Sequence, residues 1–355
     1  MFSELKNTYK DKRVFLTGHT GFKGSWLLMV LRELGAEVKG YSLAPKHDKD
    51  LYIQIDGDQL CDSVLADVRD ADRLRKEILD FQPDFIFHMA AQALVIDSYK
   101  DPLFTYETNV MGTANVLDAL RYLEKQCTTV LITTDKVYEN KERDYAYAET
   151  DELGGFDPYS NSKACCELVI SSYRRSFFPA QSYADHMQAI ASVRSGNVIG
   201  GGDRSENRIV PDIAEALEKG EKIVVRNPQA VRPWQHVLDP LNAYLWLGHL
   251  MRTQGAEYFH TFNFGPETED KMSVRDLVET AIESWGQGSY EVKQNPDAVH
   301  EAGLLMLDIT KAKEKLGWQP RFRAREAIQA TIDWYKHATG DEMEYSIGQI
   351  RNFYT

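Results

Sequence analysis

Residues 14–24, V-F-L-T-G-H-T-G-F-K-G, join an apolar run to a glycine-rich turn that opens an amphipathic pattern. Gly18, Gly21 and Gly24 are spaced three apart. Without side chains at these positions, the backbone can turn sharply and approach a pyrophosphate, and the third glycine lets a helix pack close to the preceding strand. The stretch therefore predicts the cradle of a dinucleotide cofactor, with an ordinary glycine-containing strand–turn–helix as the alternative.

A second motif follows at residues 157–163, D-P-Y-S-N-S-K, where Tyr159 stands four residues before Lys163. At the start of a helix, this spacing places a phenol and an ammonium on one face. A phenol is a poor base at neutral pH, but a nearby ammonium and a positive nicotinamide ring both favour the phenolate. Tyr159 can then take a proton from a substrate hydroxyl while hydride leaves the same carbon, and Lys163 can also hold ribose hydroxyls. A surface Tyr–Lys pair is the alternative for this spacing alone, but the two motifs in this order favour hydride chemistry on a nicotinamide cofactor.

The first half of the chain alternates short β-rich apolar runs with helical patterns. Strands joined by crossover helices form a doubly wound parallel sheet, where ligands bind at the carboxyl ends of the strands. We therefore predict an α/β fold with a Rossmann-type sheet. The expected strands are 13–17, 37–41, 84–88, 129–133 and 190–194, and the expected helices are 21–34, 70–81, 102–124 and 159–175.

The pattern changes after residue 202, and the remaining segments suit a smaller α/β lobe interleaved with the first. We expect a Rossmann domain of residues 1–202 with about 236–263, and a substrate-binding lobe of about 203–235 and 264–355. The further helices are expected at 211–219, 240–252, 273–285, 310–316 and 325–338, and the further strands at 222–226 and 261–264.

Composition restricts the classes of partner. The 355 residues are 43% hydrophobic and carry a net charge of −13. No run of eighteen apolar residues exists, and the N-terminal residues are polar, so we expect a cytoplasmic protein. Nucleic acids and anionic membranes need a basic surface, and neither is an expected partner. The four cysteines lack C-x-x-C spacing, which predicts reduced packing residues and no metal site.

Residues 133–136, T-T-D-K, follow an apolar V-L-I run. The Thr134 hydroxyl can hydrogen-bond the substrate oxygen that Tyr159 deprotonates. Asp135 and Lys136 have no task in a plain dehydrogenase, whereas elimination of water needs an acid and a base. A loop ion pair is the alternative.

The choice between NAD and NADP stays open on the residues alone. The Rossmann rule places an acid at the end of the second strand to hold the adenosine ribose, but Tyr41 and Ser42 stand there. Asp67, in L-A-D-V-R-D, is placed to reach the adenine side.

Together these residues resemble the extended short-chain dehydrogenase/reductase family over nearly the whole chain. Within that family the chain is similar to nucleotide-sugar 4,6-dehydratases, and T-D-K stands where thymidine-linked members have T-D-E. The resemblance implies bound NAD and a CDP-linked glucose as substrate. The matching stretches are G-H-T-G-F-K-G, F-Q-P-D-F-I-F-H-M-A-A-Q, T-N-V-M-G-T, D-P-Y-S-N-S-K, G-N-V-I-G-G-G-D, R-I-V-P-D-I, R-P-W-Q-H-V and N-F-G-P.

The resemblance also implies a sequence of steps. Tyr159 takes the C4 hydroxyl proton as hydride passes to NAD, Lys136 removes the acidified C5 proton, and Asp135 donates to the departing C6 hydroxyl before hydride returns to C6. Lys136 must then be neutral, although its ordinary pKa is about 10.4 and Asp135 favours the charged form. Burial and the positive cofactor ring act the other way, and water or Glu139 are alternative bases.

The implied sites extend beyond the catalytic residues Thr134, Asp135, Lys136, Tyr159 and Lys163. The cofactor site comprises Gly18, His19, Thr20, Gly21, Phe22, Lys23, Gly24, Asp67, Val68, Ala90, Ala91, Gln92, Asn109, Thr133, Tyr159 and Lys163. The substrate site comprises Gln92, Asn197, Arg208, Ile209, Val210, Arg232 and Trp234. The two arginines suit a diphosphate, which guanidinium groups grip bidentately, while Trp234 could pack on the base or fill core.

Two features keep alternatives open. The chain departs from the family pattern at A-L-V-I-D-S-Y, residues 93–99, and at V-Y-E-N-K-E-R, residues 137–143, which leaves the hexose and the nucleotide unsettled. A dehydratase or 4-epimerase acting on a UDP-, dTDP- or GDP-linked hexose is one rival, although an epimerase needs no acid–base pair at residues 135–136. A non-catalytic NAD-binding protein is the other, although such proteins commonly lose the Tyr or the Lys.

The family also implies a homodimer, or a tetramer, through the helices 102–124 and 159–175. Leu117, Leu120, Leu168 and Val169 are apolar at helical spacing, and they could face either a partner or the sheet.

Overall fold

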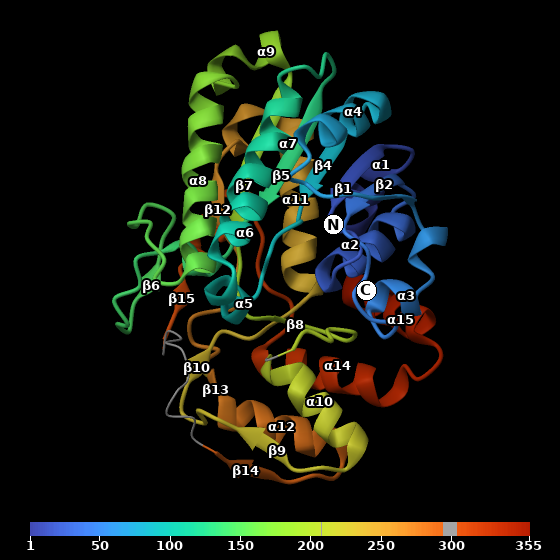
Figure 1. Ribbon diagram of the computed structural model, residues 1–355, viewed down its shortest axis with the longest axis vertical. Helices are drawn as coiled ribbons and strands as arrows, with labels where there is room; N and C mark the ends of the chain where they lie inside the picture. Colours follow the sequence, from blue (N-terminus) through green and yellow to red (C-terminus); the bar gives the residue numbers. More distant parts are fainter. Residues whose placement is uncertain (207, 294–303) are drawn as a thin grey trace.

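A computed structural model describes residues 1–206, 208–293 and 304–355. Its centre is a seven-stranded, wholly parallel sheet of order β12-β7-β5-β4-β1-β2-β3 (Figure 1). The order reverses between β1 and β4, where a doubly wound sheet opens its ligand crevice. The strands are β1 Arg13–Thr17, β2 Glu37–Ser42, β3 Asp62–Leu65, β4 Phe85–His88, β5 Cys127–Ile132, β7 Gln188–Arg194 and β12 Thr261–Asn263.

Helices cover both faces of the sheet, because alternate strand residues point to opposite sides. Phe15, Ile86 and Leu131 form a core with helices α4 (Ala71–Phe81), α7 (Gly112–Leu120) and α8 (Pro158–Ser176). On the other face, the intervening strand residues pack against α2 (Phe22–Glu33) and α11 (Leu238–Gln254). The sheet is therefore apolar on both sides, and only its edges can carry polar chemistry.

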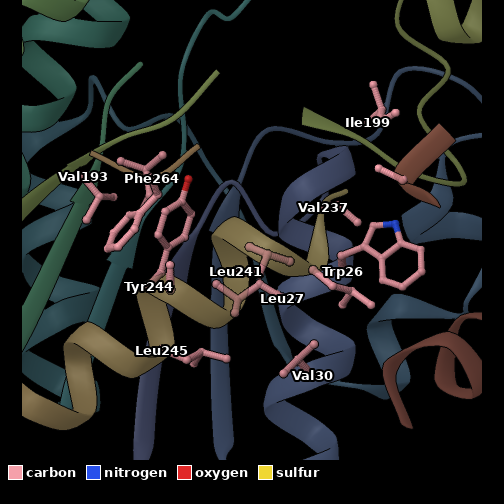
Figure 2. Close-up of a cluster of buried hydrophobic side chains, with 14 of the residues drawn as sticks. Trp26, Leu27, Val30, Val193, Ile199, Val237, Leu241, Tyr244, Leu245 and Phe264 are labelled. Carbon is pink, nitrogen blue, oxygen red and sulfur yellow. The ribbon is translucent and has the colours of Figure 1, made fainter. Parts of the chain in front are cut away.

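The second face has a dense core in which α2 and α11 lie side by side. Figure 2 shows Trp26 and Leu27 of α2 beside Leu241 and Leu245 of α11. Tyr244 belongs to the same cluster, and its hydroxyl points away from Leu245 at the cluster's edge. The packing of α11 therefore places the Tyr244 hydroxyl near the strand ends.

The remaining elements lie mostly below the sheet in the view of Figure 1, where α10, α12 and α14 pack with the pair β9–β14. The other helices are α1 Phe2–Tyr9, α3 Leu51–Gln54, α5 Val95–Lys100, α6 Pro102–Tyr106, α9 Tyr183–His186, α10 Ile209–Lys219, α12 Val274–Trp285, α13 Thr310–Leu316, α14 Ala324–His337 and α15 Glu342–Tyr354. The other strands are β6 Ala146–Tyr147, β8 Val198–Ile199, β9 Ile223–Val225, β10 Val231–Arg232, β11 Gln235–His236, β13 Met272–Ser273, β14 Tyr290–Val292 and β15 Met306–Leu307.

The predicted strands and helices of the sheet are confirmed, with one correction. The helix expected at 102–124 is not continuous: α6 gives way to a π-helical segment, Glu107–Met111, before α7. The π turn places Asn109 inside, where its amide bonds residues of two other elements. The sequence analysis also missed the short edge strand β3 and the terminal helices α1 and α15.

The division into two lobes stays a prediction. One continuous core includes residues of α2 and α11 as well as of α12 and α14, and α15 returns to pack against α2. Among the described residues, no helix has the length and apolar character needed to cross a lipid bilayer, and no group of three metal-binding side chains occurs.

Candidate active site

The glycine-rich turn lies between β1 and α2 and leaves no room for side chains at two of its three glycines. A Cβ on Gly24 would lie 2.0 Å from the Gly18 carbonyl oxygen, and one on Gly18 would lie 2.8 Å from the Ala90 nitrogen. Gly21 has open space, its nearest neighbour being 3.5 Å away. Gly18 and Gly24 are thus required for packing, and Gly21 leaves the turn open toward a ligand.

The turn is joined to the loop after β4 by Thr17, whose hydroxyl accepts hydrogen bonds from the backbone nitrogens of Met89 and Ala90, both at 3.1 Å. Ala91 and Gln92 follow directly. The carboxyl ends of β1 and β4 therefore meet at one edge, where the dinucleotide cradle was predicted.

Three side chains of the turn pack within the protein, and the fourth lies toward the catalytic residues. His19 is buried against Gly40, its Nε2 is 2.9 Å from Ser63 Oγ, and burial lowers its pKa to about 4. Thr20 bonds Ser42 Oγ at 2.9 Å, and Phe22 is half-buried. The Lys23 Nζ lies 5.9 Å from the centre of the Tyr244 ring. Only Lys23 of these four brings a charge toward the catalytic residues.

Lys23 is an unusual cation because it is half-buried and unpaired. Among the described residues, its ammonium makes no hydrogen bond or ion pair. Burial, followed by the charges of Lys163 and Arg208, lowers its pKa to about 7, although Asp135 acts in the opposite direction. Lys23 can therefore gain or lose its proton near neutral pH.

Asp67 and Val68 follow β3, at the edge predicted for adenine. The Asp67 carboxylate is held by Arg69, whose Nη2 lies 2.8 Å from Oδ2. Although burial raises the pKa of Asp67, its bonds to Arg69 lower it more. Val68 is buried and lies where a Cβ on Gly112 would meet it at 2.8 Å. The Asp67 carboxylate is therefore already paired, and its role on the adenine side stays a prediction.

Gln92 and Asn109 hold the loop after β4 rather than facing outward. The Gln92 side chain donates to Leu94 O and to Thr105 Oγ1, and its Oε1 accepts from Leu94 N. Asn109 Nδ2 donates to Gln92 O and to Ser162 Oγ. These amides brace the loop against α8, so a ligand role for the Gln92 side chain would require those bonds to change.

Tyr159 and Lys163 take their positions from the start of α8. The Asp157 side chain caps the helix by accepting from Ser160 N at 2.9 Å, and Pro158 occupies the first turn. Tyr159 therefore stands in the first turn and Lys163 one turn later. Lys163 is buried, and its Nζ donates at 3.2 Å to the carbonyl oxygen of Ile132, which is the last residue of β5.

The protein alone does not lower the pKa of Tyr159. Burial raises it to about 12, while a hydrogen bond with Thr134 and the charge of Arg208 lower it less. The expectation that Lys163 helps to activate this phenol stays a prediction. Ionisation of Tyr159 must depend on a further positive charge.

Thr134, Asp135 and Lys136 extend from β5 toward Tyr159. The Asp135 side chain is 1% exposed, and its Oδ1 accepts from Thr134 Oγ1 at 3.0 Å and lies 3.9 Å from Lys136 Nζ. Asn197 Nδ2 donates to Oδ2 at 3.4 Å. A Cβ on Gly196 would lie 1.9 Å from the carboxylate, so glycine is required there. The Asp135 carboxylate is therefore buried beside the Lys136 side chain.

The substrate-site candidates lie in two places. Arg208 precedes α10, with Nη1 3.0 Å from Asp203 Oδ2, and its charge reaches both Tyr159 and Lys23. Ile209 and Val210 continue into α10 and are half-buried and buried, respectively. This group belongs to the Tyr159 side of the site.

Arg232 and Trp234 lie in and after β10. Arg232 Nη1 donates to Val231 O at 3.1 Å, and the neighbouring hollow is lined by Val231, Pro233 and Met306 among others. Trp234 is 5% exposed and its Nε1 is buried without a partner. Its ring fills core in this structure. His236 is buried, and burial lowers its pKa to about 3.

Two contributors, Tyr244 and Glu167, were not predicted from the sequence. Tyr244, on α11, bonds the Ser195 hydroxyl, and Ser195 O accepts from Asp135 N at 3.3 Å. Glu167 and Arg194 form a buried ion pair next to Thr133, which follows β5. His88, at the end of β4, is buried, and its ring nitrogens lie 2.8 Å from Thr17 Oγ1 and 3.2 Å from Thr113 Oγ1. For Glu167, its spacing of four residues after Lys163 was the available signal.

The parallel sheet, the glycine turn and the Tyr–Lys helix define an extended short-chain dehydrogenase/reductase. The chain belongs to the GDP-mannose 4,6-dehydratase family, whose sequence model matches residues 15–331.

Two relatives and one solved structure show the range of the likeness. The chain is 44% identical to a CDP-glucose 4,6-dehydratase of Salmonella typhimurium over 93% of its length and 92% of the relative. It is 32% identical to a dTDP-glucose 4,6-dehydratase of Streptomyces antibioticus, over 91% of the chain and 92% of that protein. A dTDP-glucose 4,6-dehydratase mutant of Streptomyces venezuelae, solved with NAD, superposes with a TM-score of 0.77 at 22% identity, covering 94% and 99% of the two chains.

Proposed function

We propose that this protein catalyses the NAD-dependent 4,6-dehydration of CDP-glucose to CDP-4-keto-6-deoxyglucose. The observation that carries the proposal is the buried carboxylate of Asp135, just after β5, with Lys136 Nζ 3.9 Å from its Oδ1. The 44% identity to a CDP-glucose 4,6-dehydratase over nearly the full length supports both the reaction and the nucleotide.

The residues present fit NAD. A Cβ on Gly18 or Gly24 would collide with backbone, so the turn has the bare cradle that a pyrophosphate needs. We propose that the turn and the loop of Ala90 and Ala91 hold the diphosphate side, and that Lys163 holds the nicotinamide ribose. When bound, NAD supplies a hydride acceptor for C4 and a hydride donor for C6.

The chain's own residues then carry the protons. Tyr159 accepts the C4 hydroxyl proton, and the raised pKa of its phenol makes the positive nicotinamide ring necessary for that step. Once C4 is a ketone, the C5 hydrogen is acidic. Lys136 in its neutral form removes it, and Asp135 in its protonated form donates to the departing C6 hydroxyl, which leaves as water. When hydride reaches C6, Lys136 returns a proton to C5, and Asp135 takes up a proton from solvent before the next turnover. Thr134 orients the C4 oxygen.

A 4-epimerase is the second candidate, because solved epimerases share this fold. An epimerase needs to remove and return hydride at one carbon only, and it has no use for a buried acid beside a lysine. We therefore favour the dehydratase.

The test is to give the purified protein NAD and, separately, CDP-, dTDP-, UDP- and GDP-glucose. A 4-ketone product is detected by its absorbance in strong base. We expect kcat/KM for CDP-glucose to exceed the others at least about tenfold, which is a difference of about 1.4 kcal/mol. Equal rates with dTDP- and CDP-glucose would remove the nucleotide assignment, and no ketone with any of the four would remove the reaction.

We also propose that the enzyme is cytoplasmic and has the two lobes predicted from the sequence. We further propose that it forms a homodimer. Leu117 and Leu120 are buried against the sheet, but Leu103 on α6 and Leu168 on α8 are 74% and 60% exposed. An apolar pair of this exposure suits a helical interface. Leu168→Glu should give a monomer in light scattering, while Leu65→Glu, at an exposed leucine on β3, should not. A monomeric wild-type protein would contradict the dimer.

A further inference from the structure

Helix α8 carries a second ionised side chain beyond the Tyr–Lys pair. Glu167 stands one helical turn after Lys163, and its Oε2 lies 3.0 Å from Arg194 Nη2 in a pair whose members are 3% and 4% exposed. The same oxygen accepts from Ser192 Oγ at 2.9 Å, and Oε1 accepts from Thr133 Oγ1 at 2.5 Å. Both carboxylate oxygens are therefore occupied.

Arg194 extends this network to the far side of the strand ends. Its guanidinium lies 4.9 Å from the centre of the Tyr138 ring, and its Nη1 donates to the Tyr138 hydroxyl at 2.8 Å. Tyr138 donates in turn to Asn263 Oδ1, on β12, at 2.7 Å. The network thus joins α8 to the ends of β5, β7 and β12.

Two successive turns of α8 hold the last residues of β5. Lys163 donates to the carbonyl of Ile132, and Glu167 accepts from the hydroxyl of Thr133. Thr134 and Asp135 come directly after these two residues, and Tyr159 stands one turn before Lys163 on the same helix. The distance between the phenol and the Thr134 hydroxyl is consequently fixed by both contacts.

A buried ion pair of this kind is poor evidence for stability. Taking both ions out of water costs as much as their attraction returns, and well-packed apolar side chains often serve as well. What a fully bonded pair does supply is a fixed orientation, since every donor and acceptor must stay in place. Although burial raises the pKa of Glu167, the Arg194 charge and the hydroxyl bonds lower it, so the carboxylate stays ionised.

We propose that Glu167, held by Arg194, is a positioning residue that sets Thr134 against the Tyr159 phenol for proton transfer at C4. The proposal rests on the proposed function, since it assigns Tyr159 the C4 proton. Glu167 itself touches neither substrate nor cofactor.

The test compares Glu167→Gln and Thr133→Val with the wild-type enzyme. Thr133→Val keeps the shape of the side chain and removes the hydroxyl, which bonds the Glu167 carboxylate at 2.5 Å and the Val193 carbonyl at 3.1 Å. We expect kcat to fall about tenfold or more in both, with KM for the nucleotide sugar changed less than about threefold. The acid limb of the kcat profile should move to higher pH, because the phenol loses the bond that lowers its pKa.

Glu77→Gln is the matched control. Glu77 is also a nearly buried carboxylate, paired with Lys39 at 3.1 Å and Arg73 at 2.9 Å, but on α4, away from the site. It should lower the melting temperature as Glu167→Gln does and leave kcat and its pH profile unchanged. A normal profile in both Glu167→Gln and Thr133→Val would overturn the proposal, and if Glu167→Gln fails to fold, Thr133→Val decides.

A second measurement separates this proposal from the proposed function. The phenolate absorbance lost in Tyr159→Phe reports the titration of Tyr159 in the NAD complex without any turnover. We expect its midpoint at higher pH in Glu167→Gln and Thr133→Val than in the wild type. An unmoved midpoint refutes the positioning role even if the substrate is a different sugar, and a wild-type enzyme that makes no ketone refutes only the function.

Discussion

The ammonium nitrogen of Lys136 lies 3.9 Å from Oδ1 of Asp135, and the two side chains are 34% and 1% exposed. The carboxylate is held by Thr134 and Asn197 against Gly196, whereas the lysine reaches solvent. A buried carboxyl group beside a partly exposed lysine suits elimination, because an acid must meet one leaving hydroxyl and a base must reach a neighbouring carbon.

Asp135→Asn and Lys136→Met should separate oxidation from elimination. Both should still oxidise C4, so reduced cofactor accumulates on mixing with CDP-glucose, while ketone product forms at least about a hundredfold more slowly. Stopped-flow absorbance of the reduced cofactor measures the first step. Glu139→Gln is the comparison: a block confined to that variant would assign the base to Glu139 instead.

Tyr159→Phe should remove the first step itself. The variant lacks the group that takes the C4 proton, so we expect turnover to fall about a hundredfold to ten-thousandfold with NAD binding retained. Fluorescence titration with NADH and a turnover assay give the two quantities. Unchanged turnover would end the mechanism, because the mechanism assigns the C4 proton to Tyr159.

The charge of Lys23 should make cofactor preference depend on pH. Its pKa is lowered to about 7, so it is cationic below that value and neutral above it. Reduction removes one positive charge from the ring, and a nearby cation therefore favours NADH over NAD. The ratio of the Kd for NAD to that for NADH should rise as pH falls from 8 to 6, by up to about tenfold for charges near 10 Å apart.

Two substitutions of Lys23 check this assignment. Lys23→Met should give a ratio that is low and independent of pH, and Lys23→Arg, which stays charged, should give one that is high and independent of pH. Isothermal titration calorimetry with NAD and with NADH at three pH values measures the ratio of the two Kd values. The same pH dependence in Lys23→Met as in the wild type would place the titrating group elsewhere.

The three glycines of the cradle should differ in what their replacement harms. A Cβ on Gly24 meets the Gly18 carbonyl oxygen at 2.0 Å, so Gly24→Ala must push α2 from β1 and should cost roughly 2 kcal/mol or more of unfolding free energy. Gly21→Ala has room within the protein and should weaken NAD binding with little loss of stability. Chemical denaturation and NADH titration distinguish them, and equal stability losses would contradict this division.

The sheet could be predicted because its signal is local. The apolar run of β5 and the glycines after β1 each identify their element from neighbouring residues alone. The π-helical turn could not be predicted, since 102–120 shows no break in helical pattern, and its cause is the Asn109 amide reaching Gln92 and Ser162. The edge strand β3 is short and polar-flanked, and it shows too little alternation to be recognised.

The site was predictable by residue type more than by orientation. Four of the predicted residues lie together at the carboxyl ends of the strands, where the parallel sheet predicted them: Tyr159, Lys163, Asp135 and Lys136. The buried placement of His88 and the internal bonds of Gln92 depend on tertiary partners such as Thr113 and Thr105, which no spacing in the sequence reveals. The pKa of Tyr159 likewise follows from burial, which a helical spacing does not report.

The most direct measurement follows one hydrogen through the reaction. CDP-glucose carrying deuterium at C4 should give a product with that deuterium at C6, within the same molecule, while C5 takes a proton that exchanges with solvent. Mass spectrometry of the product from mixed labelled and unlabelled substrate reads this out. Deuterium found in solvent, returned to C4 or shared between molecules would contradict an enclosed hydride cycle, and with it the dehydratase account.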